Sequence, residues 1–413
     1  MIDVASADDR LAATDPLIPG LREVLAPLGL VRRLAPGWGA VDARVTYLRY
    51  KPGTSLVAAL VLTDDDGGTS FAQALALGRA APGKLTKVRR AGDADDVGRG
   101  AVLDAERGLA LTDVTADRHL PGARRVLRHA DDVVTSLVYK PGRRWVARVD
   151  RPGEVPALVK VHRPATVPAL RAGYEALHGL PVSGLTAVHG RRGTVTSPWV
   201  PGVPLDRLAG PGAAGLWAGA GSVLAEIHRR PPAGGLVQVD RAAALAASVA
   251  AVRAVAPDLT DDARAVAERL RVVLGDQELV RVVHGDFSAD QVIVRPDLAA
   301  ATGAAVTEPA AAGQPEVTVV DLDRVGLDDP AADLASWYGE LVAAGARPGD
   351  PREVLAPLLA GYATAGGPAD LGRLQPHCAM AVLQRAAEPF RRHLPDWPER
   401  VAHLVAVAKE LTA

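Results

Sequence analysis

The residues best suited to chemistry stand in the loop at residues 284–291, which reads His-Gly-Asp-Phe-Ser-Ala-Asp-Gln. An apolar run precedes this loop and another follows at 292–295, so the loop is expected to leave one strand and enter the next. A third apolar run, at 317–320, ends in Asp321 and Asp323. Carboxylates at the ends of apolar strands are costly to bury unless they meet a cation.

Pairing of the strands at 292–295 and 317–320 would bring Asp286, Gln291 and Asp321 together. Carboxylate and amide oxygens suit Mg²⁺, which takes few protein ligands and completes its shell with phosphate oxygens and water. Phosphoryl transfer also needs a cation on the nucleotide and a carboxylate that orients the acceptor hydroxyl and takes its proton. The spacing therefore predicts a metal-dependent phosphoryl-transfer site.

A strand lysine upstream is the candidate for the cation on the nucleotide. Lys160 lies in the apolar run 157–161, where burying a lysine costs free energy unless an anion meets it. A lysine that extends to water from a strand edge is the alternative interpretation. Apolar residues at helical spacing then predict a helix over 166–177, and this helix carries Glu175.

A short internal repeat lies upstream of these residues. Residues 46–61 (TYLRYKPGTSLVAALV) and 135–150 (TSLVYKPGRRWVARVD) are identical at eight of sixteen aligned positions, including Tyr-Lys-Pro-Gly. In each copy two β-rich runs flank a Pro-Gly turn, which predicts a β-hairpin, and a third extended run follows. We therefore expect two small antiparallel sheets in tandem, and only the second has a lysine in its third strand.

Helical patterns dominate from residue 205 onward, so a sheet-rich first half precedes a helix-rich second half. The 413 residues are 48% hydrophobic and 23% charged, which is typical of a globular protein. A net charge of −1 offers no broad positive surface for nucleic acid or an anionic membrane. No apolar run reaches the roughly 20 residues that span a bilayer. The single cysteine, Cys378, and the lack of a secretory signal predict a cytoplasmic protein.

Four separated motifs resemble those of the aminoglycoside phosphotransferase and choline kinase-like superfamily, whose members share the protein-kinase fold. The superfamily pattern is H-G-D-x4-N, an apolar strand ending in an acidic motif, and D-P-x2-D-L-A. This chain has HGDFSADQ at 284–291, VTVVDLD at 317–323 and DPAADLA at 329–335. The stretch LAEIH at 224–228 resembles the helix that precedes the loop in the superfamily. The resemblance covers roughly residues 133–340.

The resemblance and the repeat together imply an α+β, bilobal protein-kinase-like fold. We expect an extra N-terminal cap subdomain at residues 1–110, built as a degenerate copy of half a lobe. An N-lobe with a small antiparallel sheet would follow at 111–202, and a mainly helical C-lobe with the catalytic and acceptor sites would occupy 203–413.

The resemblance also implies roles for the acidic residues of the loop and of the strand that follows it. Asp286 would be the catalytic base, and Gln291 and Asp321 the metal ligands. Asp323 would either contact a second metal or brace the loop. We expect Asp333 to cap the helix that begins near residue 334.

The nucleotide would be ATP, bound by the sheet-rich half of the chain. By resemblance, Lys160 would hold the α- and β-phosphates and pair with Glu175. The other expected nucleotide contacts belong to the turn that would cover the phosphates and to the segment that would meet the adenine, namely Lys140, Gly142, Ser197, Trp199 and Val200.

Gln291 stands where most of the superfamily has asparagine. A damaged metal site would make the chain an inactive nucleotide-binding regulator. The H-G-D-x4-Q form and an N-terminal cap are, however, also features of maltokinase-like sugar kinases, and the first repeat, about residues 25–90, is similar to such a cap. We therefore expect an ATP- and Mg²⁺-dependent kinase acting on a hydroxyl of a sugar, amino sugar or aminocyclitol. An aminoglycoside-type antibiotic kinase is the alternative, and the oligomeric state stays open.

Overall fold

The computed structural model describes residues 6–79, 82–129, 131–208, 213–275, 279–311 and 313–413. The chain forms two compact units. The first comprises Met1–Val167, Ala187–Thr196 and Glu388–Glu399, and the second comprises Pro168–Thr186, Ser197–Ala387 and Arg400–Ala413. The division into cap, N-lobe and C-lobe at residues 110 and 202 stays a prediction.

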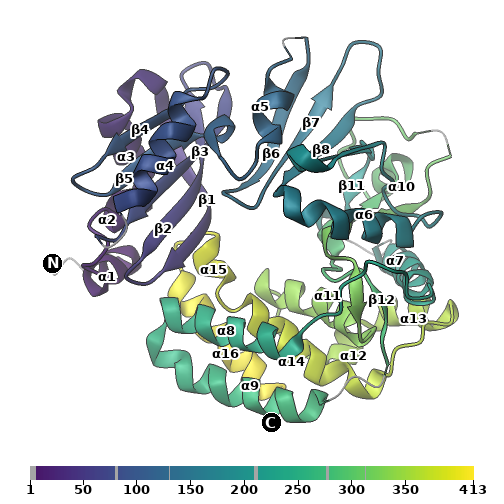
Figure 1. The fold of residues 1–413 in the computed structure, drawn as a ribbon. Coiled ribbons are helices and arrows are strands. Elements are labelled where there is room, and N and C mark those ends of the chain that lie inside the picture. The colour runs from purple at the N-terminus through teal and green to yellow at the C-terminus, as the bar shows by residue number, and fades with distance from the viewer. Residues whose placement is uncertain (1–5, 80–81, 130, 209–212, 276–278, 312) are drawn as a thin grey trace. The chain divides into compact units, whose positions relative to one another are not determined.

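Two five-stranded sheets form most of the first unit, and their strands follow the same spatial order. Figure 1 labels most of these strands. The first sheet consists of β1 (Ala40–Lys51), β2 (Ser55–Asp64), β3 (Thr69–Leu77), β5 (Leu109–Asp113) and β4 (Ala101–Asp104). The second consists of β6 (Val133–Lys140), β7 (Arg144–Asp150), β8 (Ala157–His162), β10 (Thr194–Pro198) and β9 (Ala187–His189). The predicted tandem sheets are confirmed, and the duplication extends from the hairpin to the whole sheet.

The two Pro-Gly turns close their hairpins in the same register. Lys51 lies opposite Ser55 in the first sheet, and Lys140 lies opposite Arg144 in the second. The turn glycines have φ of 66° and 64°, a left-handed conformation that glycine adopts without steric cost. The repeated Tyr-Lys-Pro-Gly sequence therefore encodes one turn geometry twice.

The helices of the first unit are short and flank the sheets. They are α1 (Ala7–Thr14), α2 (Leu21–Leu25), α3 (Pro27–Leu34), α4 (Pro82–Asp93), α5 (Gly122–Leu127) and α15 (Glu388–Arg391). A shared apolar cluster joins the two sheets, because Ala59 of β2 packs in one core with Tyr139 of β6 and Trp145 of β7. The two copies of the repeat thus fold as one body.

Helices dominate the second unit, as the sequence predicted. They are α6 (Val167–Ala176), α7 (Ala213–His228), α8 (Arg241–Val255), α9 (Thr260–Leu274), α10 (Pro296–Ala301), α11 (Ala331–Ala343), α12 (Pro351–Val354), α13 (Ala356–Thr364), α14 (Leu374–Arg385) and α16 (Trp397–Glu410). Within the described residues, no helix is both long and apolar enough to cross a membrane. Small antiparallel sheets followed by a helical part confirm the predicted α+β class.

Short strands in the second unit carry the loop at 284–291. β12 (Arg281–Val283) pairs with β15 (Gly326–Asp328), and β13 (Val292–Val294) lies between β11 (Val203–Pro204) and β14 (Val317–Val319). The predicted pairing of the strands at 292–295 and 317–320 is confirmed. β13 and β14 are antiparallel, with Val292 opposite Val319.

Candidate active site

The loop at 284–291 leaves β12 and enters β13 through a sharp turn at Gly285. This glycine has a φ of 82°, and a Cβ there would lie 2.3 Å from the carbonyl oxygen of Arg324. No other residue fits at this position without moving the backbone. The turn places Asp286 beside the connection between β14 and β15, and a single 3-10 turn, Ala289–Gln291, then leads into β13.

A buried carboxylate holds the start of this loop. Asp333, 1% exposed, accepts hydrogen bonds from the amides of His284 (2.6 Å) and Gly285 (2.8 Å). His228 donates to it from Nε2 at 3.1 Å, and the Nδ1 of that ring is hydrogen-bonded to the hydroxyl of Tyr362 at 2.7 Å. Burial alone would raise the pKa of Asp333, but the hydrogen bonds from His228 and the loop outweigh it, so the pKa lies below its usual range.

The expectation that Asp333 caps a helix is wrong. Helix α11 begins at Ala331, so Asp333 lies inside its first turn rather than before it. The capping hydrogen bond comes instead from Asp329, which accepts from the amide of Ala331 at 3.0 Å. Asp333 is thereby free to satisfy the loop amides, which would otherwise be buried without partners.

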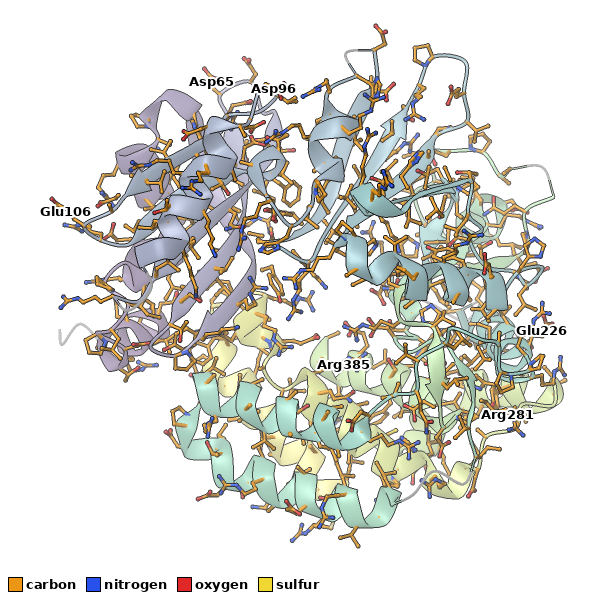
Figure 2. The ribbon with its side chains drawn as sticks, viewed as in Figure 1. Asp65, Asp96, Glu106, Glu226, Arg281 and Arg385 are labelled. Atoms are coloured by element: carbon orange, nitrogen blue, oxygen red, sulfur yellow. The ribbon has the colours of Figure 1, made fainter. Side chains whose placement is uncertain are left out.

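Two arginines flank the carboxylate of Asp286. The Nη1 of Arg324 lies 3.5 Å from its Oδ2, and the Nη2 of Arg385 lies 3.7 Å from its Oδ1. Arg385, the last residue of α14 and labelled in Figure 2, is 7% exposed and also donates to Glu340 (3.1 Å) and Ser336 (2.9 Å). The two guanidinium groups therefore place positive charge beside both oxygens of the carboxylate.

The predicted metal ligands lie at the end of this loop and in the segment that follows β14. Asp321 lies two residues after the end of β14 and has a φ of 61°, a conformation that is rare and strained outside glycine. The side-chain Nε2 of Gln291 donates to Oδ2 of Asp290 at 2.6 Å, and this bond fixes the orientation of the Gln291 side chain. Asp323 lies in the 3-10 turn Leu322–Arg324.

The donor chemistry of Gln291, Asp321 and Asp323 fits Mg²⁺. Two carboxylates and an amide provide the hard oxygen ligands that this ion prefers, with phosphate and water to complete the octahedron. Across the described residues, no group of three or more histidine, cysteine or acidic side chains forms a metal cage. The predicted set contains only two acids, so its binding of Mg²⁺ would depend on the phosphates.

In the first unit, Lys160 lies on β8 and is buried at 4% exposure. The alternative of a lysine extended to water is therefore wrong. Glu175 lies on α6 in the second unit, where its Oε1 accepts from Arg171 at 2.7 Å and the side chain is 61% exposed. The pairing of Lys160 with Glu175 stays a prediction.

The turn expected to cover the phosphates is tied down by Asp117. This buried carboxylate accepts from the Gly142 amide (2.6 Å) and the Tyr139 hydroxyl (3.0 Å). The carbonyl of Gly142 accepts from Arg163, and the ammonium of Lys140 lies 5.9 Å above the ring of Tyr47. The turn is therefore held by side chains that precede and follow its hairpin.

The same brace occurs in the first repeat. Asp15 accepts from the Tyr50 hydroxyl and from the Gly53 amide, both at 2.7 Å. Sequence analysis missed both aspartates, although the pattern Asp-x2-[Ile/Leu]-Pro-Gly at 15–20 and 117–122 marks them. The duplication therefore includes the carboxylate that fixes each turn.

The segment expected to meet the adenine begins at the end of β10. Ser197 is buried at 3% exposure. The indole Nε1 of Trp199 donates to Glu308 at 2.8 Å. The roles of Ser197, Trp199 and Val200 in nucleotide binding stay predictions.

Comparison with known proteins places the chain in a family. Residues 123–377, more than half of its length, match the phosphotransferase enzyme family, and the chain belongs to that family. The predicted activity, phosphoryl transfer to an alcohol group, is thereby confirmed at the level of class, and so is the protein-kinase-like fold. No match was found among the curated proteins.

Several solved structures are similar to this chain. An aminoglycoside phosphotransferase from Streptomyces rimosus is 21% identical, with 66% of this chain and 98% of that one covered and a TM-score of 0.46. A choline/ethanolamine kinase family protein from Mesorhizobium loti is 16% identical, with 72% and 93% covered and a TM-score of 0.45. A choline kinase from Streptococcus pneumoniae is 14% identical, with 68% and 95% covered and a TM-score of 0.48.

Proposed function

We propose that this phosphotransferase is an ATP- and Mg²⁺-dependent kinase that phosphorylates a hydroxyl of a sugar, amino sugar or aminocyclitol. The observation that carries the proposal is the position and surroundings of the Asp286 carboxylate. Its carboxylate follows a glycine turn that Asp333 fixes, it is 38% exposed, and it lies between two guanidinium groups. A fixed and accessible carboxylate can orient an acceptor hydroxyl and take its proton.

The other roles follow from the chemistry of each side chain. Lys160, as a buried cation, is proposed to hold the α- and β-phosphates of ATP. Gln291 and Asp321 would coordinate the Mg²⁺ that bridges the phosphates, and Asp323 would support them. Mg²⁺ would neutralise charge on the transferred group, while Asp286 positions the acceptor hydroxyl.

A sugar-like acceptor is supported by the Gln form of the loop and by the duplicated half lobe, both features of maltokinase-like enzymes. The test is a screen of sugars, amino sugars, aminocyclitols and aminoglycosides, with ADP release measured in the presence of ATP and Mg²⁺. Acceptor-dependent ADP release with a neutral sugar or aminocyclitol supports the proposal. Release with aminoglycosides alone would favour the antibiotic kinase instead.

Lys160→Met is expected to weaken ATP binding by about 10- to 100-fold, because a charge-assisted contact to phosphate contributes roughly 1.5–3 kcal/mol. Methionine keeps the length of the side chain, and the thermal unfolding midpoint is measured alongside to show that the variant is folded. Isothermal titration with a non-hydrolysable ATP analogue measures the affinity. Wild-type affinity in the folded variant would remove Lys160 from the nucleotide site.

Variants at Gln291 distinguish an active kinase from an inactive nucleotide-binding protein. Gln291→Asn keeps the amide oxygen and should retain turnover within about tenfold, whereas Gln291→Ala should raise the Mg²⁺ concentration for half-maximal ADP release by roughly 10- to 100-fold. Mg²⁺ titrations of ADP release on the best acceptor give both values. Identical Mg²⁺ curves for all three proteins would mean that Gln291 is not a metal ligand.

A further inference from the structure

A basic pocket lies in the first unit, next to the turn at 139–142. Its walls come from the first sheet and α4 on one side and from residues 116–119, Gly142 and Arg163 on the other. Its volume is about 250 Å³. Pockets for drug-sized ligands hold roughly 300–1,000 Å³, so this pocket suits a small ligand rather than a whole nucleotide.

Positive charge dominates the walls of this pocket. The cationic residues that line it are Arg49, Lys51, Lys84, Arg118 and Arg163. The one carboxylate among the lining residues, Asp117, already accepts two hydrogen bonds from Tyr139 and Gly142. Like charges held together repel one another, and they are stabilised by an anion that neutralises them.

Four of these cations make no direct contact with a carboxylate of the described residues. Throughout the described part of the chain, the side-chain nitrogens of Arg49, Lys51, Lys84 and Arg118 form no hydrogen bond or ion pair. Burial lowers the pKa of Arg49, Arg143 and Arg163 lower it further, and Tyr47 and Asp117 offset only part of this shift. Their donors are therefore available to a ligand with several acceptor oxygens.

A second, independent feature points to a ligand. Thr112 of β5 lines the pocket, is 3% exposed, and its hydroxyl has no hydrogen-bond partner among the described residues. A buried hydroxyl without a partner is rare in native proteins, because water bound it in the unfolded chain. An acceptor oxygen that reached this hydroxyl from the pocket would satisfy it.

We propose that this pocket binds the phosphoryl group of a small phosphorylated molecule. Phosphate oxygens match both the guanidinium and ammonium donors and the free hydroxyl of Thr112. Arg163 lines the pocket and donates to the Gly142 carbonyl, and Asp117 binds the Gly142 amide. Occupancy of the pocket therefore stabilises the turn at 139–142. An effect of occupancy on the affinity for ATP rests on the proposed role of this turn in covering the nucleotide.

The ligand has two possible sources with the same chemistry. It can be an effector that binds and is released unchanged, or an acceptor that already carries a phosphate. The two are separated by adding a sugar phosphate together with ATP and Mg²⁺. A change in nucleotide affinity without consumption of the sugar phosphate identifies an effector, and its phosphorylation, lost in Arg49→Gln, identifies an acceptor.

Binding itself is tested by calorimetric titration of inorganic pyrophosphate into the full-length protein in the presence of EDTA. We expect one saturable site in the wild type, with affinity weakened about tenfold or more by the double variant Arg49→Gln, Lys84→Gln. Lys87→Gln, one helical turn from Lys84 and outside the pocket wall, is the matched control and should bind as the wild type does. Equal affinity in the double variant and the control would overturn the proposal.

Two further variants make the test specific. Thr112→Val removes a hydroxyl without a partner, so it should weaken pyrophosphate binding while leaving thermal stability unchanged. Lys160→Met should bind pyrophosphate normally, because Lys160 does not line the pocket. Loss of binding in Lys160→Met would assign pyrophosphate to the nucleotide site and refute a separate pocket. None of these binding measurements depends on phosphoryl transfer. They therefore test the pocket even if no acceptor in the screen is phosphorylated.

Discussion

Asp286→Asn is expected to lower kcat by roughly 10³- to 10⁴-fold, because the variant can neither take the proton of the acceptor hydroxyl nor orient it through a negative charge. The affinity for ATP should stay within about threefold, since the carboxylate acts on the acceptor rather than on nucleotide binding. ADP release on the best acceptor measures kcat, and titration of a non-hydrolysable ATP analogue measures the affinity.

Asp290→Asn is the matched control for this experiment. It makes the same chemical change four residues later in the same loop, where the carboxylate bonds Ser288 and Gln291 rather than an arginine. Its kcat should stay within about tenfold of the wild type. A larger loss of kcat in Asp290→Asn than in Asp286→Asn would show that Asp286 is not the catalytic base.

Asp333→Ala is expected to destabilise the protein by about 3–5 kcal/mol, because it leaves the amides of His284 and Gly285 and the ring of His228 buried without an acceptor. Turnover should also fall, since these amides fix the turn that presents Asp286. Urea unfolding followed by far-UV circular dichroism gives the free energy of unfolding, and ADP release gives kcat.

Asp333→Asn provides a graded comparison. The asparagine keeps the volume and one acceptor oxygen but turns an amide group toward the donors, so both losses should be intermediate. Asp261→Ala removes a carboxylate that is 92% exposed and should leave unfolding and turnover unchanged. If Asp333→Ala unfolded at the same urea concentration as the wild type, the hydrogen bonds of Asp333 to the loop would not contribute to stability.

Features encoded by short stretches of sequence were predictable. The Pro-Gly hairpins, the buried strand lysine Lys160 and the strand-loop-strand around 284–291 depend on backbone preferences and alternating apolar residues, which act over a few positions. The repeat was visible because the same turn is encoded twice. The acidic strand ends were predictable as well, since burying charge without a partner is costly wherever the chain folds.

Residues that act through distant partners were not predictable in the same way. Arg385 reaches Asp286 from a helix almost a hundred positions later, and nothing in the helix marks it as different from other helical arginines. The prediction that Asp333 caps a helix rests on the preference of aspartate for the N-cap position. Its contact with a loop 49 positions earlier overrides that local preference, because buried amides require an acceptor.

The sequence by itself determined the strand-loop-strand around 284–291, a strand lysine among apolar residues and a duplicated hairpin, because each depends on neighbours along the chain. Only the tertiary structure decided what surrounds them: the arginines beside Asp286, the carboxylates that fix the turns, and the basic pocket next to the turn at 139–142. These depend on which side chains meet after folding. Charge and hydrogen-bond energies are set by such distances in space, whereas sequence order records only separation along the chain.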